Sequence, residues 1–276
     1  MTVTEPAPAK INLALHLRRL RPDGYHDLET LFAFARDGDR VMVADAAQDS
    51  FTVTGPFAVT LAEAGGDNLV LRARDAFRAA VGCPPVSITL DKHLPVASGI
   101  GGGSADAAAT LRALARLCDL RSDEPRLLDL AALLGADVPA CLMGETAFAT
   151  GRGDQLRPLP PLGDQPLLLV NPGVPLSTAA MFAAWDGADA GPVVWERGVL
   201  EAVLRAGNSF TPAAIAAAPI IAAVLDLLAT APGAILARLS GSGATCFALF
   251  DGSSDRDAAA DRARARGWWT LATVAR

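Results

Sequence analysis

The residues best suited to chemistry lie in a glycine-rich segment with the sequence PVASGIGGGSA, residues 95–105. Glycine adopts backbone conformations that other residues avoid and lets a ligand approach the main chain closely. Alternating apolar and polar residues over 86–90 predict a strand before this segment, and the alanine- and leucine-rich residues 104–120 predict a helix after it. Free backbone N–H groups and the positive end of the helix dipole favour an anion there. The segment is therefore predicted to be a phosphate cradle.

Other glycine-rich loops fit this segment less well. A P-loop ends in Gly-Lys-Ser or Gly-Lys-Thr, and no lysine follows these glycines. The dinucleotide fingerprint needs a glycine at the sixth position from Gly99, where this chain has Ser104. The further motifs of protein kinases are absent downstream. A flexible surface loop stays open as the alternative, although the close flanking strand and helix argue against it.

Two polar groups outside the cradle could act on a phosphorylated ligand. Lys10 and Asn12 flank one apolar residue in a segment, 9–17, that predicts a strand, so both point to the same face. Asp137 follows Gly135, which is predicted to end a helix, and its carboxylate could accept a hydroxyl proton. The alternatives are an exposed strand lysine and a turn aspartate that bonds its own backbone.

Two turns complete the set of candidate residues. Pro22-Asp23-Gly24 predicts a turn before Tyr25 and His26, an aromatic ring and an imidazole that could stack on a base and bond its edge. A turn with a packed tyrosine is the alternative. The loop SGSGAT, residues 240–245, precedes a predicted strand and could hold the other end of a polyphosphate, or be a plain tight turn.

Strands and helices alternate without regular βαβ spacing, so we predict an α+β fold with two lobes. The Pro-rich stretch 157–166 predicts the lobe boundary, giving lobes 1–157 and 158–276, with a return of the last strand to the first lobe left open. Turns are predicted at Asp37-Gly38-Asp39 and Gly55-Pro56, and Asp67 as a helix N-cap. Further strands are predicted over 41–44, 51–53, 147–149, 166–170, 234–239, 246–250 and 270–274. Further helices are predicted over 68–81, 124–134, 178–185, 198–206, 220–230 and 255–267.

Composition limits the class of protein. The chain has 276 residues and a net charge of −6, which argues against a general nucleic-acid binder. We expect no membrane span, because no uncharged apolar run reaches the required length, and a cytoplasmic location, because the N-terminus lacks signal-peptide character. The four cysteines show no C-x-x-C spacing and are expected to be free thiols.

Five segments together resemble the GHMP small-molecule kinases: AKINLALHL, DGYHDLET, LPVASGIGGGSADAA, GADVPACL and LSGSGATCFALF, in this order between Lys10 and Phe250. The cradle alone indicates the superfamily. The K-I-N strand and the G-Y-H turn are similar to those of members that act on a cytidine-diphosphate-linked methylerythritol. The resemblance implies a two-lobed fold with the active site in the cleft, and ATP- and Mg²⁺-dependent phosphorylation of the tertiary 2-hydroxyl group of that alcohol.

The resemblance also implies roles for single residues. Lys10 and Asp137 match the catalytic pair, in which the lysine keeps the carboxylate ionised and the carboxylate takes the hydroxyl proton. The positions that match ATP contacts are Asn68, Lys92, Pro95, Val96, Ala97, Ser98, Gly99, Ile100, Gly101, Gly102, Gly103, Ser104 and Ala105. The positions that match substrate contacts are Asn12, Tyr25, His26 and Phe182, with cytosine between Tyr25 and Phe182. Ser104, at the start of the predicted helix, could touch phosphate or metal, and the protein ligands of Mg²⁺ are not identified by the sequence.

Some positions depart from the family pattern. Ala97 and Ser98 stand where many members have glycine, Ala105 replaces a frequent serine, and Ser209 follows Asn208 where aspartate is commoner.

Two other functions stay open: a GHMP kinase for a sugar, homoserine or mevalonate-type substrate, and a nucleotide-binding member without catalysis. The Tyr25-His26 turn argues against the first, and the presence of both members of the catalytic pair argues against the second. A monomer and a homodimer are both compatible with the sequence.

Overall fold

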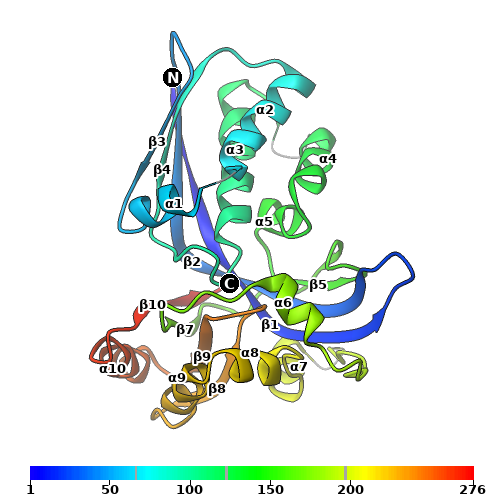
Figure 1. The fold of residues 1–276 in the computed structure, drawn as a ribbon. Helices are drawn as coiled ribbons and strands as arrows, with labels where there is room; N and C mark the ends of the chain where they lie inside the picture. Colours follow the sequence, from blue (N-terminus) through cyan, green and yellow to red (C-terminus); the bar gives the residue numbers. More distant parts are fainter. Residues whose placement is uncertain (66, 122–123, 196–197) are drawn as a thin grey trace. The chain divides into compact units, whose positions relative to one another are not determined.

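The computed structural model describes residues 1–276 except 66, 122–123 and 196–197 (Figure 1). The chain forms two units, each of which packs mainly on itself. Unit 1 comprises Met1–Ala9, Asp37–Val96 and Gly101–Gly144, and unit 2 comprises Lys10–Arg36, Ala97–Ile100 and Glu145–Arg276. This division differs from the predicted lobes 1–157 and 158–276. The N-terminal strands and the glycine-rich segment each contribute to both units, because a long strand can continue from one packed layer into another.

Unit 1 contains a sheet that matches the predicted strands in this region. Strand β3 (Ser50–Thr54) is parallel to β4 (Val86–Asp91), and β4 is antiparallel to the C-terminal part of β2 (His26–Asp45). The long strand β1 (Thr2–Leu20) pairs with β2. Burial alternates along β4, as its sequence predicts for a strand with one face on a core. The strand that leads into the cradle is thereby confirmed.

Gly38 lies inside β2, so the turn predicted at Asp37-Gly38-Asp39 is wrong. A Cβ atom at this position would lie 2.2 Å from the carbonyl oxygen of Ala7. Glycine is needed here because another segment of backbone passes too close for any side chain. Glycine is used both in turns and where two backbone segments approach closely. The sequence alone does not distinguish these two uses.

Unit 1 has five helices in its described part, and α2 to α5 pack together in one group (Figure 1). The five helices are α1 (Ala58–Ala64), α2 (Leu69–Val81), α3 (Gly102–Leu117), α4 (Pro125–Leu134) and α5 (Val138–Met143). Alanine makes up most of the buried residues of α3, which allows its neighbours to approach closely. The N-cap of α2 is Asn68 rather than the predicted Asp67, since the Asn68 side chain accepts a hydrogen bond from the N–H of Val70.

Unit 2 contains four antiparallel strands in the order β10, β7, β9, β8. They are β7 (Gln165–Asn171), β8 (Ala234–Leu239), β9 (Cys246–Phe250) and β10 (Trp269–Ala275). The last strand also meets β2, at the pair Ala275–Ala35. A hairpin of β5 (Ala147–Thr150) and β6 (Gln155–Pro158) pairs with β2 around Leu31. The predicted strands of this region are confirmed, with bounds that shift by one residue or less at most ends.

Helices cover the sheet of unit 2 and complete its core. Those that contribute to this core are α6 (Thr178–Ala183), α8 (Thr211–Ala217), α9 (Ile220–Ala229) and α10 (Ser253–Arg264), and the unit also contains α7 (Val199–Arg205). The α+β class is confirmed, because strands and helices are mixed and most sheet neighbours are antiparallel. No helix in the described part of the chain has the length and apolarity needed to cross a membrane.

Candidate functional site

The start of α3 forms one end of the predicted cradle, within unit 1. Gly101 is the N-cap in a left-handed conformation, φ +64°, and the helix begins at Gly102, two residues earlier than predicted. No side chain caps this helix. The first backbone N–H groups of an α-helix lack partners within the helix, so an uncapped start presents donors to an anion. This geometry suits a phosphate group at Gly102–Ser104.

The other end of the cradle, Ala97–Ile100, is held by the SGSGAT loop within unit 2. The Ser240 hydroxyl donates to the carbonyl oxygen of Gly99 over 3.1 Å, and the N–H of Thr245 donates to that of Ser98 over 3.2 Å. A Cβ atom at Gly99, where φ is +76°, would lie 2.6 Å from the Ser240 carbonyl oxygen. The two glycine-containing loops that the sequence singled out therefore pack against each other, and Gly99 is required by both space and backbone conformation.

Ala97 adopts a left-handed conformation with φ +50°. This conformation strains a residue with a Cβ atom and costs a glycine nothing. The departure from glycine noted at this position thus has a physical consequence, which is local backbone strain. Ser98 is buried and Ala105 is part of the buried face of α3, so neither small side chain obstructs the loop.

Lys10 and Asn12 do share one face of β1, as the strand spacing predicts, and both are buried in unit 2. The Lys10 ammonium donates to Asn12 Oδ1 over 2.9 Å and lies 4.7 Å from the centre of the Phe32 ring. Asn12 Nδ2 donates to the Thr30 hydroxyl over 2.8 Å. Lys10 is only 3% exposed, so the alternative of an exposed strand lysine is wrong. A buried ammonium held by fixed partners is suited to stabilising negative charge.

The turn before Tyr25 is confirmed, with Asp23 accepting a hydrogen bond from the N–H of Tyr25 and Gly24 at φ +82°. Tyr25 is 55% exposed, which rules out the alternative of a packed tyrosine. The Arg152 guanidinium lies 4.8 Å from the centre of its ring. The phenol ring is therefore available at the surface, with a cation over one face.

His26 and Phe182, which the sequence assigned to one ligand, lie side by side in unit 2. Their ring centres are 4.8 Å apart with an interplanar angle of 28°, and Trp185 meets the His26 ring edge-on at 5.4 Å. Phe182 is in turn supported edge-on by the buried Phe210. The aromatic group at the start of β2 and on α6 could bind a planar ring by stacking. Trp185 was not singled out from the sequence.

Asp137 lies at the start of α5 in unit 1, and it is half-buried. Its side chain makes no capping hydrogen bond to that helix. The N–H of Cys141 donates instead to the main-chain carbonyl oxygen of Asp137. The carboxylate therefore does not cap its own helix. The short helix begins with Val138 and Pro139, because proline tolerates the first turn.

Two other predicted ATP contacts have structural partners in unit 1. Asn68 is the N-cap of α2 and accepts the N–H of Val70 at 2.9 Å. Lys92 is 2% exposed, and its ammonium donates to Asp39 over 2.5 Å and to Asp106 over 2.7 Å. A Cβ atom at Gly102 would lie 3.1 Å from this ammonium, so Lys92 lies beneath the start of α3 rather than on the surface of the cradle.

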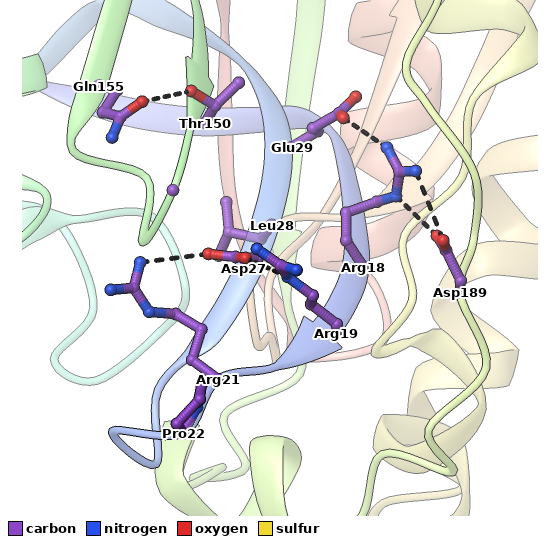
Figure 2. A pocket seen from close by; sticks show the side chains of 11 residues that line it. Arg18, Arg19, Arg21, Pro22, Asp27, Leu28, Glu29, Thr150, Gln155 and Asp189 are labelled. Atoms are coloured by element: carbon purple, nitrogen blue, oxygen red, sulfur yellow. Dashed lines mark hydrogen bonds and ion pairs between the residues drawn. The ribbon is translucent and has the colours of Figure 1, made fainter.

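A pocket of about 730 Å³ lies beside the Tyr25 turn, within unit 2 (Figure 2). Its lining includes three arginines that are paired with carboxylates, and none of the predicted site residues lines it. Arg18 pairs with Glu29 and, at 2.6 Å, with Asp189, while Arg21 reaches Asp27 at 3.2 Å. The hydrogen bond from Arg18 lowers the pKa of Asp189. The pairing balances the charges, so we interpret this pocket as the support of the hairpin that carries Tyr25.

Some residues that hold the loops in place were not predicted from the sequence. Asn208 Nδ2 donates to the carbonyl oxygens of Leu239 and Gly241, each over 2.8 Å, which fixes the SGSGAT loop. Ser209 accepts the N–H of Leu17, so the departure noted at this position supplies a contact to β1. Asp106 was also missed, although a signal exists: it is the single charge in the buried alanine-rich turn that follows the cradle.

Two family models match the chain. The GHMP kinases N terminal domain matches residues 68–145, which include the cradle and Asp137. The GHMP kinases C terminal model matches residues 197–267, which include the SGSGAT loop. Together these models cover more than half of the chain.

Individual relatives resemble the chain over nearly its whole length. A protein of Rhizorhabdus wittichii named 4-diphosphocytidyl-2-C-methyl-D-erythritol kinase is 53% identical, covering 98% of this chain and 94% of the relative. A crystal structure of 4-(cytidine 5'-diphospho)-2C-methyl-D-erythritol kinase has a TM-score of 0.83 at 34% identity, covering 99% of both chains. Homoserine kinase from Cytophaga hutchinsonii has a TM-score of 0.69 at 19% identity, covering 100% of this chain and 94% of that one, a likeness of fold alone.

Proposed function

Because this chain belongs to the GHMP kinase family, we propose that it transfers the γ-phosphoryl group of ATP to the 2-hydroxyl group of 4-diphosphocytidyl-2-C-methyl-D-erythritol. The reaction is a step in the non-mevalonate synthesis of isoprenoid precursors. The observation that carries the proposal is the full-length identity of 53% to a relative named as this kinase. The Tyr25-His26 turn and the neighbouring Phe182 support it, since a base-linked substrate needs aromatic surfaces.

The phosphates of ATP would lie at the uncapped start of α3 and along the loop before it. The N–H groups of Gly102, Gly103 and Ser104 would donate to phosphate oxygens, and the helix dipole would favour their charge. Glycines there let the phosphates reach the main chain without meeting side chains. The SGSGAT loop would keep residues 97–100 in the conformation that this contact requires.

The chemical step forms a bond between the substrate oxygen and the γ-phosphorus and breaks the bond to the β-phosphate oxygen of ADP. Positioning and charge stabilisation supply most of the catalysis in such transfers. We assign Asp137 as the base that orients the hydroxyl group and takes its proton. We assign Lys10 as the cation that stabilises negative charge on the transferring group, a role for which its hydrogen bond to Asn12 fixes the ammonium.

Substrate recognition would depend on the aromatic residues of unit 2. Tyr25 and Phe182 would stack on cytosine, and His26 would bond the edge of the base. The pyrimidine is remote from the reacting hydroxyl group, so its binding energy would serve to orient the substrate. Asn12 would contribute a polar contact on the substrate side while it holds Lys10.

Mg²⁺ would accompany the nucleotide and neutralise charge on its phosphates. This ion prefers phosphate, carboxylate and water oxygens, and it keeps several of its waters. Among the residues that the structure describes, no three His, Cys, Asp or Glu side chains form a group that could hold a metal ion. We assign its binding to the phosphate oxygens of ATP and name no protein ligand.

The proposal is tested by ADP release from purified protein with ATP, Mg²⁺ and the cytidylylated alcohol. Parallel reactions contain the alcohol without cytidine diphosphate, homoserine and mevalonate. Turnover with the cytidylylated alcohol alone supports both the reaction and the role of the aromatic residues. Turnover only with homoserine or mevalonate would replace the substrate and keep the kinase class. ATP binding without turnover on any alcohol would favour the non-catalytic alternative.

A further inference from the structure

A buried cluster of three charged side chains lies in unit 1 beneath the start of α3. Asp39 accepts the N–H groups of His93 and Leu94 through Oδ1, and the Lys92 ammonium through Oδ2. Lys92 also donates to Asp106 Oδ2 over 2.7 Å. The other oxygen of Asp106 is buried and has no hydrogen-bond partner in the described part of the chain. The cluster therefore contains one orphaned carboxyl oxygen.

This cluster is adjacent to the turn that would bind phosphate. A Cβ atom at Gly102 would lie 3.1 Å from the Lys92 ammonium and 3.8 Å from Asp39 Oδ2. Asp106 is four residues after Gly102, on the same face of the helix, at roughly 6 Å along its axis. The three charges are thus within one helical turn of the N–H groups proposed for the phosphates.

The charges in the cluster do not balance when both carboxyl groups are ionised, since one ammonium faces two carboxylates. Asp39 receives three hydrogen bonds, whereas Asp106 receives one and keeps one oxygen without a partner among the described residues. Leaving an unpaired buried oxygen charged is costly, and a proton removes that cost. Burial, opposed by the Lys92 ammonium and reinforced by the Asp39 carboxylate, raises the pKa of Asp106 to about 7. A proton that enters the cluster should therefore reside on Asp106.

We propose that Asp106 takes up a proton when the polyphosphate of a nucleotide binds at the start of α3. The inference rests on the proposed function only in that this turn binds ATP phosphates. Bringing further negative charge to this turn disfavours the ionised carboxylate and favours the neutral acid. Lys92, which directly follows β4, and Asp39, on β2, are the charged groups that face Asp106. Asp106 is then a positioning residue: its protonation lowers the negative charge beneath the cradle when the phosphates bind.

The sign of the effect follows from linkage. Between the pKa of Asp106 in the free protein and its higher pKa in the complex, nucleotide binding takes up a proton. Affinity should therefore fall as pH rises through this range, by at most tenfold per pH unit for a single proton. The titration of the nucleotide's own phosphates adds to the measurement, so the comparison must be made against a variant that lacks only the Asp106 carboxyl group.

Calorimetry of ADP and of a non-hydrolysable ATP analogue with Mg²⁺, in two buffers of different ionisation enthalpy, measures the protons taken up. At pH 7.5 the wild type should take up more than Asp106→Asn, by up to about 0.75 proton for a free-protein pKa of about 7. Asp129→Asn, an exposed change on α4, is the matched control and should equal the wild type. Equal uptake in the wild type and Asp106→Asn overturns the inference.

A second measurement covers the case in which Asp106→Asn does not fold. Carbon-13 resonances of the Asp106 carboxyl group, titrated in the wild type, should show a pKa that rises when ADP is added. A pKa that stays constant or falls overturns the inference. Turnover is assayed on the same protein, so a working kinase without proton linkage refutes this inference alone. A wild type that binds no nucleotide refutes both this inference and the proposed function.

Discussion

The ammonium of Lys10 donates a hydrogen bond to Asn12 Oδ1 over 2.9 Å, and the same asparagine donates to the Thr30 hydroxyl. The lysine is thereby held in one direction although its side chain is long and flexible. A buried cation that is fixed in this way needs little reorganisation when charge develops beside it. The hydrogen bond between these neighbours on β1 is therefore part of the proposed machinery.

Replacing Asn12 should disturb both stability and turnover. Asn12→Leu keeps the approximate shape but removes the acceptor for Lys10, leaving a buried ammonium with fewer partners. We expect a loss of about 1–3 kcal/mol in the free energy of unfolding and at least a tenfold lower kcat, measured by urea unfolding and by ADP release. Thr30→Val, which keeps the Lys10–Asn12 bond, is the control and should reduce kcat less. Equal effects of the two variants would contradict the positioning of Lys10.

Asp137→Asn should remove the base and keep the fold. The asparagine is isosteric, and the aspartate side chain does not cap α5, so the helix should form as before. General-base catalysis typically contributes about 10²–10⁴ in rate, so kcat should fall by that factor with little change in the KM for ATP. Circular dichroism and thermal unfolding check the fold. Near-normal turnover would remove Asp137 as the base.

Tyr25→Ala should weaken the binding of the cytidylylated substrate and leave the binding of ATP unchanged. The ring is exposed, so little stability should be lost, and stacking of a base on an aromatic ring is worth about 1–3 kcal/mol. The KM for the substrate should rise roughly 5- to 150-fold, while that for ATP stays within about twofold. Tyr25→Phe keeps the stacking surface and should behave like the wild type. If Tyr25→Ala weakened the binding of the cytidylylated substrate and of ATP equally, this would count against the stacking role.

Gly99→Ala should destabilise the cradle. The new Cβ would lie within 2.6 Å of the Ser240 carbonyl oxygen, at a φ of +76°. We expect a loss of about 1–3 kcal/mol from backbone strain alone and a large rise in the KM for ATP. Ala97→Gly is the opposite change in the same loop, where strain relief and the greater entropy of the unfolded chain nearly offset each other. Ala97→Gly should therefore change the free energy of unfolding by less than about 1 kcal/mol. An equally small effect of Gly99→Ala would refute the close packing of the two loops.

Asp49 should make unit 1 sensitive to acid. Two hydrogen bonds from Arg78, and one from the N–H of Val86, hold the pKa of Asp49 well below its usual range. A depressed folded-state pKa contributes stability above the unfolded pKa, near 4, and this contribution is lost as pH falls below it. Asp49→Asn should thus cost about 1 kcal/mol at pH 7 and progressively less below pH 4. Urea unfolding of the wild type and Asp49→Asn at pH 7, 4 and 3 measures this loss of stability, and Asp75→Asn, an exposed change, is the control. A loss of stability that does not vary with pH would contradict the prediction.

The cradle and its flanking elements could be predicted because their determinants are local. Alternation over residues 86–90 gives a strand, alanine-rich residues after 103 give a helix, and glycines between them leave the backbone free. Gly135 and the Pro22-Asp23-Gly24 turn were identified for the same reason. The family also followed from sequence, since several short motifs occur together in one order and with one spacing.

Tertiary structure decided what no local pattern contains. Gly38 was mistaken for a turn residue because the backbone that excludes a side chain there is 31 positions away in the chain, at Ala7. Asp39 and Lys92 are separated by 53 positions, yet they form one ion pair. The division of the chain into units was also different from the one predicted, because proline-rich composition marks a loop and does not reveal which strands continue from one unit into the other.

The sequence by itself determined the chemical groups, namely a phosphate cradle, a lysine, an aspartate and an aromatic turn, because residue types and their spacing carry that information directly. Only the tertiary structure decided that Lys10 is buried against Asn12 and Phe32, and that a second lysine and two aspartates lie beneath the cradle. Burial and the direction of a side chain result from the packing of segments that are far apart in the chain. The electrostatic properties of a charged group depend on those neighbours and are therefore set by the folded chain.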